Sequence, residues 1–123
     1  MKYRLLWVML LFCLMVGNIQ AQDAPMVRLV KIVVTSSSLD TYTQLLKAQM
    51  NTAIAEEEGV LESHVVTENN QPNVFTLIEI YRDSSAYRAH LKTPHFLAYK
   101  TATANMVQSL TLLDALLVAQ VVK

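Results

Sequence analysis

The chain has 123 residues, with 10 basic side chains, 10 acidic side chains and a formal net charge of zero. This length predicts a single domain. A chain without a basic excess is an unlikely partner for nucleic acid. One cysteine cannot form an intrachain disulfide, so a packed core must hold the fold together.

The first 21 residues have the three regions of a secretory signal peptide. Lys2 and Arg4 precede an apolar run over residues 5–16, and a polar stretch follows that ends at Ala21. The run is shorter than the ~20 apolar residues that a membrane-spanning helix needs. We therefore expect cleavage after Ala21 and export to the periplasm, over retention as an anchor. A large residue precedes Cys13, which argues against lipidation there.

Cleavage would leave a domain over residues 22–123. Two basic residues and no acidic ones leave with the signal, so the mature net charge is 8 − 10 = −2. The only cysteine and the only tryptophan leave as well. A domain of about 100 residues buries only about two-thirds of its chain surface alone, so dimerisation would help to stabilise it.

The first half of the mature chain predicts a strand, a helix and a hairpin. Residues 26–35 are rich in Val and Ile at both alternating positions, which is typical of a strand covered on two faces. Ser38 suits a helix N-cap and Gly59 a C-cap. Two strands, 60–68 and 74–82, follow around a polar loop. The intervening helix carries an apolar stripe of Tyr42, Leu45, Leu46, Gln49, Met50, Ala53 and Ile54.

The second half predicts two short helices and a last strand. Asp83 suits the cap of a helix over 84–92, and Thr93 followed by proline suits the start of a second helix, from 94 to about 108. The apolar run 112–122 predicts the last strand. The order β-α-β-β-α-β indicates an α+β, ferredoxin-like fold with two helices on one face of an antiparallel sheet. Since the first and last strands are apolar on both faces, we expect a second copy to cover the other face, as a homodimer.

Two stretches, "EEEGVLESHVV" and "FTLIEIYRDSSAYRAHLKTPHFLAY", resemble the antibiotic biosynthesis monooxygenase superfamily, especially its quinol-monooxygenase-like members. The resemblance covers residues 27–122. It implies a dimeric barrel of paired sheets, with a pocket between the helices and the sheet of each protomer. It also implies oxidation of hydroquinones by O2 without a metal or other cofactor.

Other branches of the superfamily isomerise a phosphorylated dione or cleave haem. The haem-cleaving branch has a Trp in the short helix, an axial His in the long one and an Asn on the first strand. Here those positions fall on His90, on Lys100 and on a strand without Asn. These departures argue against haem cleavage.

The predicted catalytic residues are Glu79, His90 and His95. The third strand advances about 13 Å from Glu79 to Asp83, at ~3.3 Å per residue, and a helix folding back returns about 9 Å to His90. Glu79 is thus expected to orient one of the two histidines through a hydrogen bond. His90 or His95 is then expected to remove a hydroxyl proton from the substrate. His95, in the first turn of a helix, is expected to be neutral and able to accept a proton. The residues expected to bind the substrate are Tyr81, Tyr99, Leu77 and Phe96.

Structural readings of the same residues stay open. Glu79 and a His can form a satisfied buried pair without catalysis. His64 is expected on a strand surface, and a metal site of His64, His90 and His95 has no close ligand pair in its favour. The run 56–58 reads as a solvated helix end. Two other functions also remain: isomerisation of a small dicarbonyl, with Arg82, Arg88 or Lys92 for a phosphate group, and non-catalytic binding of a small molecule.

Overall fold

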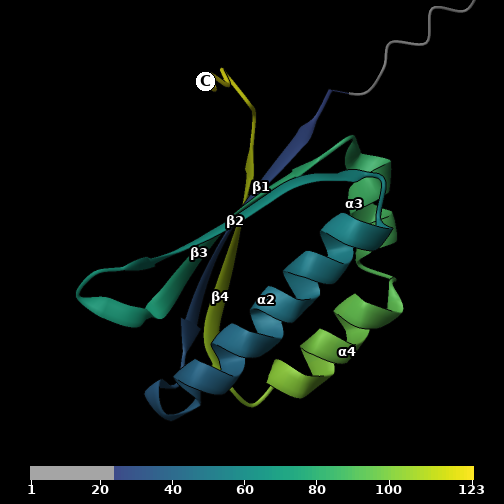
Figure 1. Ribbon diagram of the computed structural model, residues 1–123. Helices are drawn as coiled ribbons and strands as arrows, with labels where there is room; N and C mark the ends of the chain where they lie inside the picture. The colour runs from purple at the N-terminus through teal and green to yellow at the C-terminus, as the bar shows by residue number, and fades with distance from the viewer. Residues whose placement is uncertain (1–23) are drawn as a thin grey trace, which may run out of the picture.

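The computed structural model describes residues 24–123, so the predicted signal peptide lies outside the described residues. The described chain forms four strands and three α-helices, with one 3-10 turn (Figure 1). None of the helices within this range is long and apolar enough to cross a membrane. The elements are β1 (Met26–Val34), η1 (Ser36–Ser38), α2 (Leu39–Glu56), β2 (Val60–Glu68), β3 (Gln71–Tyr81), α3 (Ser84–His90), α4 (Pro94–Thr103) and β4 (Val107–Ala115).

The strands form one antiparallel sheet in the order β2-β3-β1-β4, which confirms the ferredoxin-like α+β fold. Helices α2 and α4 lie side by side on one face of the sheet, and α3 lies near the end of β3 (Figure 1). The two short helices predicted between β3 and the last strand are both present, as α3 and α4, although α4 ends at Thr103 and not near residue 108. The sheet face opposite the helices is left without a layer of its own.

The core fills the space between α2 and the central strands. Its largest fully buried side chain is Tyr42 of α2, whose ring packs edge-on against Phe75 at 5.1 Å between centroids. Leu46 lies one turn further along the same stripe and is also buried. The strands contribute Val30, Ile32, Val34, Phe75 and Leu77. Alternation along β1 and β3 brings all five to the helix side of the sheet.

The two predicted caps at the short helices are confirmed. The Asp83 carboxylate accepts a hydrogen bond from the backbone N–H of Ala86 at 2.7 Å, and the Thr93 hydroxyl accepts one from Phe96 at 3.3 Å. Pro94 occupies the first turn of α4, where its missing N–H costs no helical bond. The short turn between α3 and α4 is thus encoded locally.

Gly59 does not cap α2 as predicted. The helix ends at Glu56, Glu57 is already extended, and no glycine of residues 24–123 has a positive φ. A Cβ at position 59 would lie 2.5 Å from the Cβ of Ala86. The glycine is required because the start of β2 passes directly against α3.

The hairpin loop is shorter than predicted. Glu68 pairs with Gln71, which leaves a two-residue turn of Asn69 and Asn70. β3 therefore includes Pro72, which lies two residues before the predicted start of the strand at residue 74. This is tolerated because β3 begins to pair with β1 only at Val74, so the missing N–H of the proline costs no bond to that strand.

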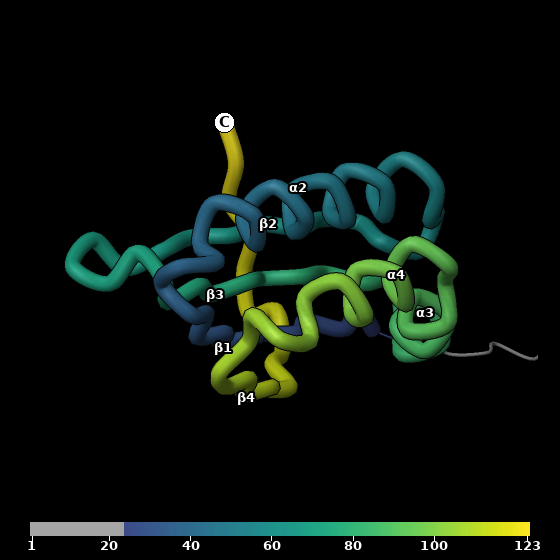
Figure 2. Tube along the Cα trace, turned by 90° about the horizontal axis from the view of Figure 1, so that it is seen from below, coloured from purple at the N-terminus to yellow at the C-terminus, as the bar shows by residue number. Residues whose placement is uncertain are grey.

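The last strand was predicted too late in the chain. β4 covers Val107–Ala115, and α4 ends at Thr103. Val107 pairs with Val34 and Ala115 with Val27, so β4 stops where β1 stops offering partners. Residues 116–123 then leave the sheet edge, and Gln120 donates a hydrogen bond to Glu62 of β2. The C-terminal segment thus crosses the sheet face away from the helices, and Figure 2 shows it passing β2.

We expect Gly59→Ala to destabilise the fold by about 1–3 kcal/mol, because the added methyl group overpacks the contact with Ala86. Urea unfolding of the variant would measure this loss. Ala86→Gly in the same background should recover part of it, after allowance for the lower helix propensity of glycine. A double-mutant cycle without coupling between the two positions would contradict the steric explanation.

Candidate active site

A cavity of about 350 Å³ lies between the helices and the sheet. Its walls are mostly apolar and come from β1, β3, β4 and the three α-helices. Leu77 and Phe96, both predicted to bind substrate, are among the lining residues. The polar and charged side chains in the lining are Arg28, Gln49, Glu79, Tyr81, His90, Tyr99, Lys100 and Thr103.

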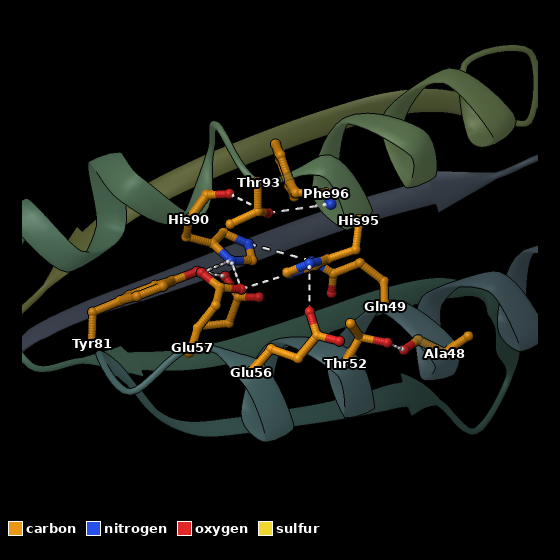
Figure 3. Close-up of polar contacts among 11 residues, drawn as sticks. Ala48, Gln49, Thr52, Glu56, Glu57, Tyr81, His90, Thr93, His95 and Phe96 are labelled. Carbon is orange, nitrogen blue, oxygen red and sulfur yellow. Dashed lines mark hydrogen bonds and ion pairs between the residues drawn. The ribbon is translucent and has the colours of Figure 1, made fainter.

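Beside the cavity, one carboxylate joins two histidines. Oε2 of Glu57 lies 2.8 Å from Nδ1 of His90 and 2.7 Å from Nε2 of His95 (Figure 3). The three side chains are 12%, 4% and 16% exposed, respectively. The end of α2, the last residue of α3 and the first turn of α4 therefore meet at a single carboxylate.

Glu57 was not predicted as a site residue, because the acidic run 56–58 is typical of a solvated helix end. Glu56 does have an exposed side chain, at 67%. Glu57 differs because it leaves the helix in an extended conformation, with φ −107° and ψ 102°, and this turns its side chain inward. Three consecutive acidic residues before a glycine gave a hint, since they cannot all continue one helical face.

His90 links this cluster to the cavity. Its ring lines the cavity and packs against Phe96 at 4.8 Å and Tyr81 at 5.5 Å between centroids. Nε2 lies 3.4 Å from the side-chain nitrogen of the buried Gln49, which also lines the cavity. An ionised carboxylate can only accept, so Nδ1 of His90 donates to Glu57. In the neutral ring, Nε2 then carries the lone pair and accepts from Gln49.

Glu79 lines the cavity but does not hold a histidine. Its Oε2 accepts a hydrogen bond from the Tyr81 hydroxyl at 3.0 Å, and Glu57 takes the place that the sequence analysis gave to Glu79. Burial raises the pKa of Glu79, and the Tyr81 hydrogen bond and His90 oppose this only in part. Geometry along the strand placed Glu79 level with His90, but it did not reveal a nearer carboxylate from another element. A catalytic role for Glu79 stays a prediction.

Tyr99 of the cavity wall is hydrogen-bonded to Tyr42 of the core. The hydroxyls of Tyr42 and Tyr99 lie 2.6 Å apart. Burial raises the pKa of both phenols, so both stay protonated over the physiological range. Tyr99 was expected to face the substrate, and it does line the cavity. Its hydroxyl can donate to a ligand only by giving up the bond to Tyr42 or by accepting from it.

His64 lies outside this cluster. It pairs with Glu62 on β2 at 3.0 Å, and its side chain is 60% exposed. The three histidines, which the sequence did not favour as a metal site, are accordingly not brought together. Within residues 24–123, the group that brings metal-ligand atoms together is Glu57, His90 and His95, whose candidate atoms all lie within 4.8 Å of one another.

Arg28 is a further cavity residue that the sequence analysis did not identify. Its guanidinium lies 4.2 Å from the ring centre of Tyr87 and forms an ion pair with Asp114 of β4. Its Nε is buried without a hydrogen-bond partner among the described residues. Such a donor is expensive to bury unless a ligand or water satisfies it.

A family model described as antibiotic biosynthesis monooxygenase matches residues 25–102. A solved structure from Bacteroides thetaiotaomicron, a proposed antibiotic biosynthesis monooxygenase, is 40% identical over 81% of this chain and 95% of its own, with a TM-score of 0.77. A proposed monooxygenase from Lactobacillus acidophilus is 33% identical over 76% of this chain, which spans only 45% of that protein, with a TM-score of 0.73. A search of curated proteins finds no match.

We expect Glu79→Gln to stabilise the protein above neutral pH. The folded-state pKa of Glu79 is raised above the ordinary 4.5, so the wild-type protein loses stability as pH rises through that folded value, where the buried carboxyl must ionise. Glutamine avoids this cost and can still accept from Tyr81. Urea unfolding midpoints of both proteins at about pH 8 should differ in favour of the variant, and the gain should disappear below pH 4.5.

Glu62→Gln is the matched control. The pKa of this exposed carboxyl is lowered, first by its hydrogen bond from His64, so its replacement should bring no gain at high pH. An equal response of both variants to pH would contradict the role of burial at Glu79.

Proposed function

Because the chain belongs to the antibiotic biosynthesis monooxygenase family, we propose that it oxidises a hydroquinone-like aromatic substrate with O2, using no cofactor. A hydroquinone and O2 give a hydroxylated quinone and water. One oxygen atom enters the ring, the other leaves as water, and the substrate supplies all four electrons. The base that starts the reaction removes a hydroxyl proton, because the phenolate gives up an electron to O2 far more readily than the phenol.

The observation that carries this proposal is the setting of His90. Its Nδ1 is held by a buried carboxylate at 2.8 Å, while the same ring lines an apolar cavity. A phenolic hydroxyl has a pKa of about 10, so its transfer to an imidazole needs help of a few kcal/mol. Glu57 supplies part of this help, since a carboxylate at Nδ1 stabilises the imidazolium that forms. His90 is thus the proposed base, and Glu57 is a positioning residue.

The cavity suits a flat aromatic substrate. Leu77 and Phe96 offer apolar surface, and Tyr99 adds a ring with a polar edge. Arg28 offers an unpaired donor to a substrate oxygen or to the superoxide formed after the first electron transfer. The mostly apolar walls also strengthen each such contact, because the effective dielectric beside them is lower than in bulk water.

Isomerisation of a phosphorylated dicarbonyl is the second candidate. The cavity is lined by two cationic side chains, Arg28 and Lys100, which could receive a phosphate. The cations expected from the sequence, Arg82, Arg88 and Lys92, are not in the lining. Arg28 is already paired with Asp114, which reduces its charge toward a dianion. A catalytically silent binding module is the third candidate.

We expect O2 uptake with a panel of hydroquinones, and we expect His90→Gln to lower the rate by about 10²–10⁴-fold, the usual contribution of a general base. His64→Gln is the matched control, because it removes an exposed histidine with a carboxylate partner. An oxygen electrode measures the rate, and chelator treatment beforehand should leave it unchanged.

Three results would contradict the role of His90 or the oxygenase itself. Equal rates in the wild type and His90→Gln would remove His90 as the base. Conversion of a dicarbonyl without O2 would favour the isomerase. Saturable binding of aromatics with no turnover would favour the binding module.

We also propose that the protein is a homodimer. β4 is an edge strand with exposed leucines on both faces: Leu112 on the cavity side is 50% exposed, and Leu113 on the opposite side is 58% exposed. A second copy packed on β4 and on the uncovered sheet face would bury this surface and complete the cavity wall. Export of the protein is a separate proposal that rests on residues 1–21 alone.

We expect light scattering after size exclusion to give twice the mass of the chain. Leu113→Glu should shift the protein to monomers, because it places a charge within the proposed interface. Leu97→Glu is the control, since Leu97 is similarly exposed, at 53%, but lies on α4. A wild-type monomer at all concentrations would refute the dimer.

A further inference from the structure

We propose that Glu57, His90 and His95 bind one divalent transition-metal ion such as Zn²⁺, and that this ion inhibits the enzyme by removing the lone pair that His90 offers to the cavity. Two imidazoles and one carboxylate are a common set of zinc ligands. Here their candidate atoms lie within 4.8 Å of one another. The inhibitory part of the proposal rests on the proposed function, whereas the metal site does not.

The ligand atoms need only a small adjustment. Oε2 of Glu57 is 2.8 Å from Nδ1 of His90 and 2.7 Å from Nε2 of His95. Around a tetrahedral zinc with bonds of ~2.0–2.2 Å, ligand atoms lie roughly 3.3 Å apart. The two contacts of Glu57 must therefore widen by about half an ångström, and the two ring nitrogens, which lie within 4.8 Å of each other, must come to a similar separation. The three residues lie at the ends of three different helices, so side-chain rotation can supply this without moving a strand.

The charge around the carboxylate favours a cation. Among the described residues, the ionic and hydrogen-bonding partners of Glu57 are the two imidazoles. No ammonium or guanidinium group in that set has to be displaced. A metal ion would take the position between the carboxylate and the rings that hydrogen-bond protons now occupy.

Both histidines also have an outer partner for the nitrogen that would face away from the metal. Nδ1 of His95 lies 3.7 Å from Oε2 of Glu56, and Nε2 of His90 lies 3.4 Å from the Gln49 amide. Metal-bound histidines usually donate this second N–H to a carboxylate or carbonyl. Glu56 would accept after a small rotation that shortens the 3.7 Å distance, and a half-turn of the Gln49 amide would bring its oxygen to His90 (Figure 3).

Metal binding and base catalysis require opposite tautomers of His90. Without metal, Nδ1 donates to Glu57 and Nε2 has a lone pair beside the cavity. With metal on Nδ1, the neutral ring carries its proton on Nε2 and has no lone pair for the substrate. Gln49 satisfies either form, as a donor in the first and an acceptor in the second. Zinc binding should therefore remove the base while the residues that line the cavity stay in place.

The test is a titration of chelator-treated, tag-free protein with Zn²⁺ by calorimetry, and with Co²⁺ by its visible absorption. We expect saturation at one equivalent. Glu57→Gln and His95→Gln should each weaken binding at least tenfold, because even outer partners change metal affinity by about 10–100-fold. His64→Gln should bind like the wild type. Zn²⁺ should also raise the urea midpoint of the wild type but not that of His95→Gln.

The outcomes separate the two halves of the proposal. A wild type without saturable binding, or binding that His64→Gln abolishes and His95→Gln leaves intact, overturns the metal site. Zinc bound at the cluster with an unchanged rate of O2 uptake overturns the inhibition. If zinc binds as expected but the metal-free protein oxidises no hydroquinone, the site stands and the proposed function fails.

Discussion

The buried carboxylate of Glu57 is the constraint on which the site depends. It accepts hydrogen bonds from His90 and His95 at once, and it thereby joins the ends of α2, α3 and α4. Its position requires a helix that stops one residue earlier and a β2 strand that starts close against α3. Gly59 allows that close approach, because any side chain there would collide with Ala86. The segment 57–59 thus sets both the packing of β2 against α3 and the position of the carboxylate that binds the two histidines.

Two kinds of buried polar group lie in the cavity wall and directly behind it. Glu57 and His90 satisfy each other, and so do the hydroxyls of Tyr42 and Tyr99. Glu79 is different, because a single hydroxyl partner does not offset the cost of burying its charge, and its pKa is raised. A fold keeps an ionisable group of that kind at a cost in stability, which is typical of functional sites. The cavity is therefore lined by one histidine, His90, that is paired with a carboxylate, and by one carboxyl group, Glu79, whose pKa is raised by burial.

Much of the fold followed from local signals. The strand over residues 60–68 and the caps at Asp83 and Thr93 were predicted because turn and cap residues act within three positions along the chain. The limits of β4 were not, because a strand ends where its neighbour stops pairing, and that neighbour is β1, some 80 positions away. An apolar segment such as 116–122 reads as a strand whether or not a partner is present.

The sequence by itself determined the element order, the family and two of the three residues in the cluster, His90 and His95. It also placed Glu79 near the cavity, since strand and helix rises fix distances along one continuous segment. Only the tertiary structure decided that Glu57 is the carboxylate the histidines share. That contact joins residues 33 and 38 positions apart on separate elements, and it depends on how α2 ends and packs, which no local pattern of residues encodes.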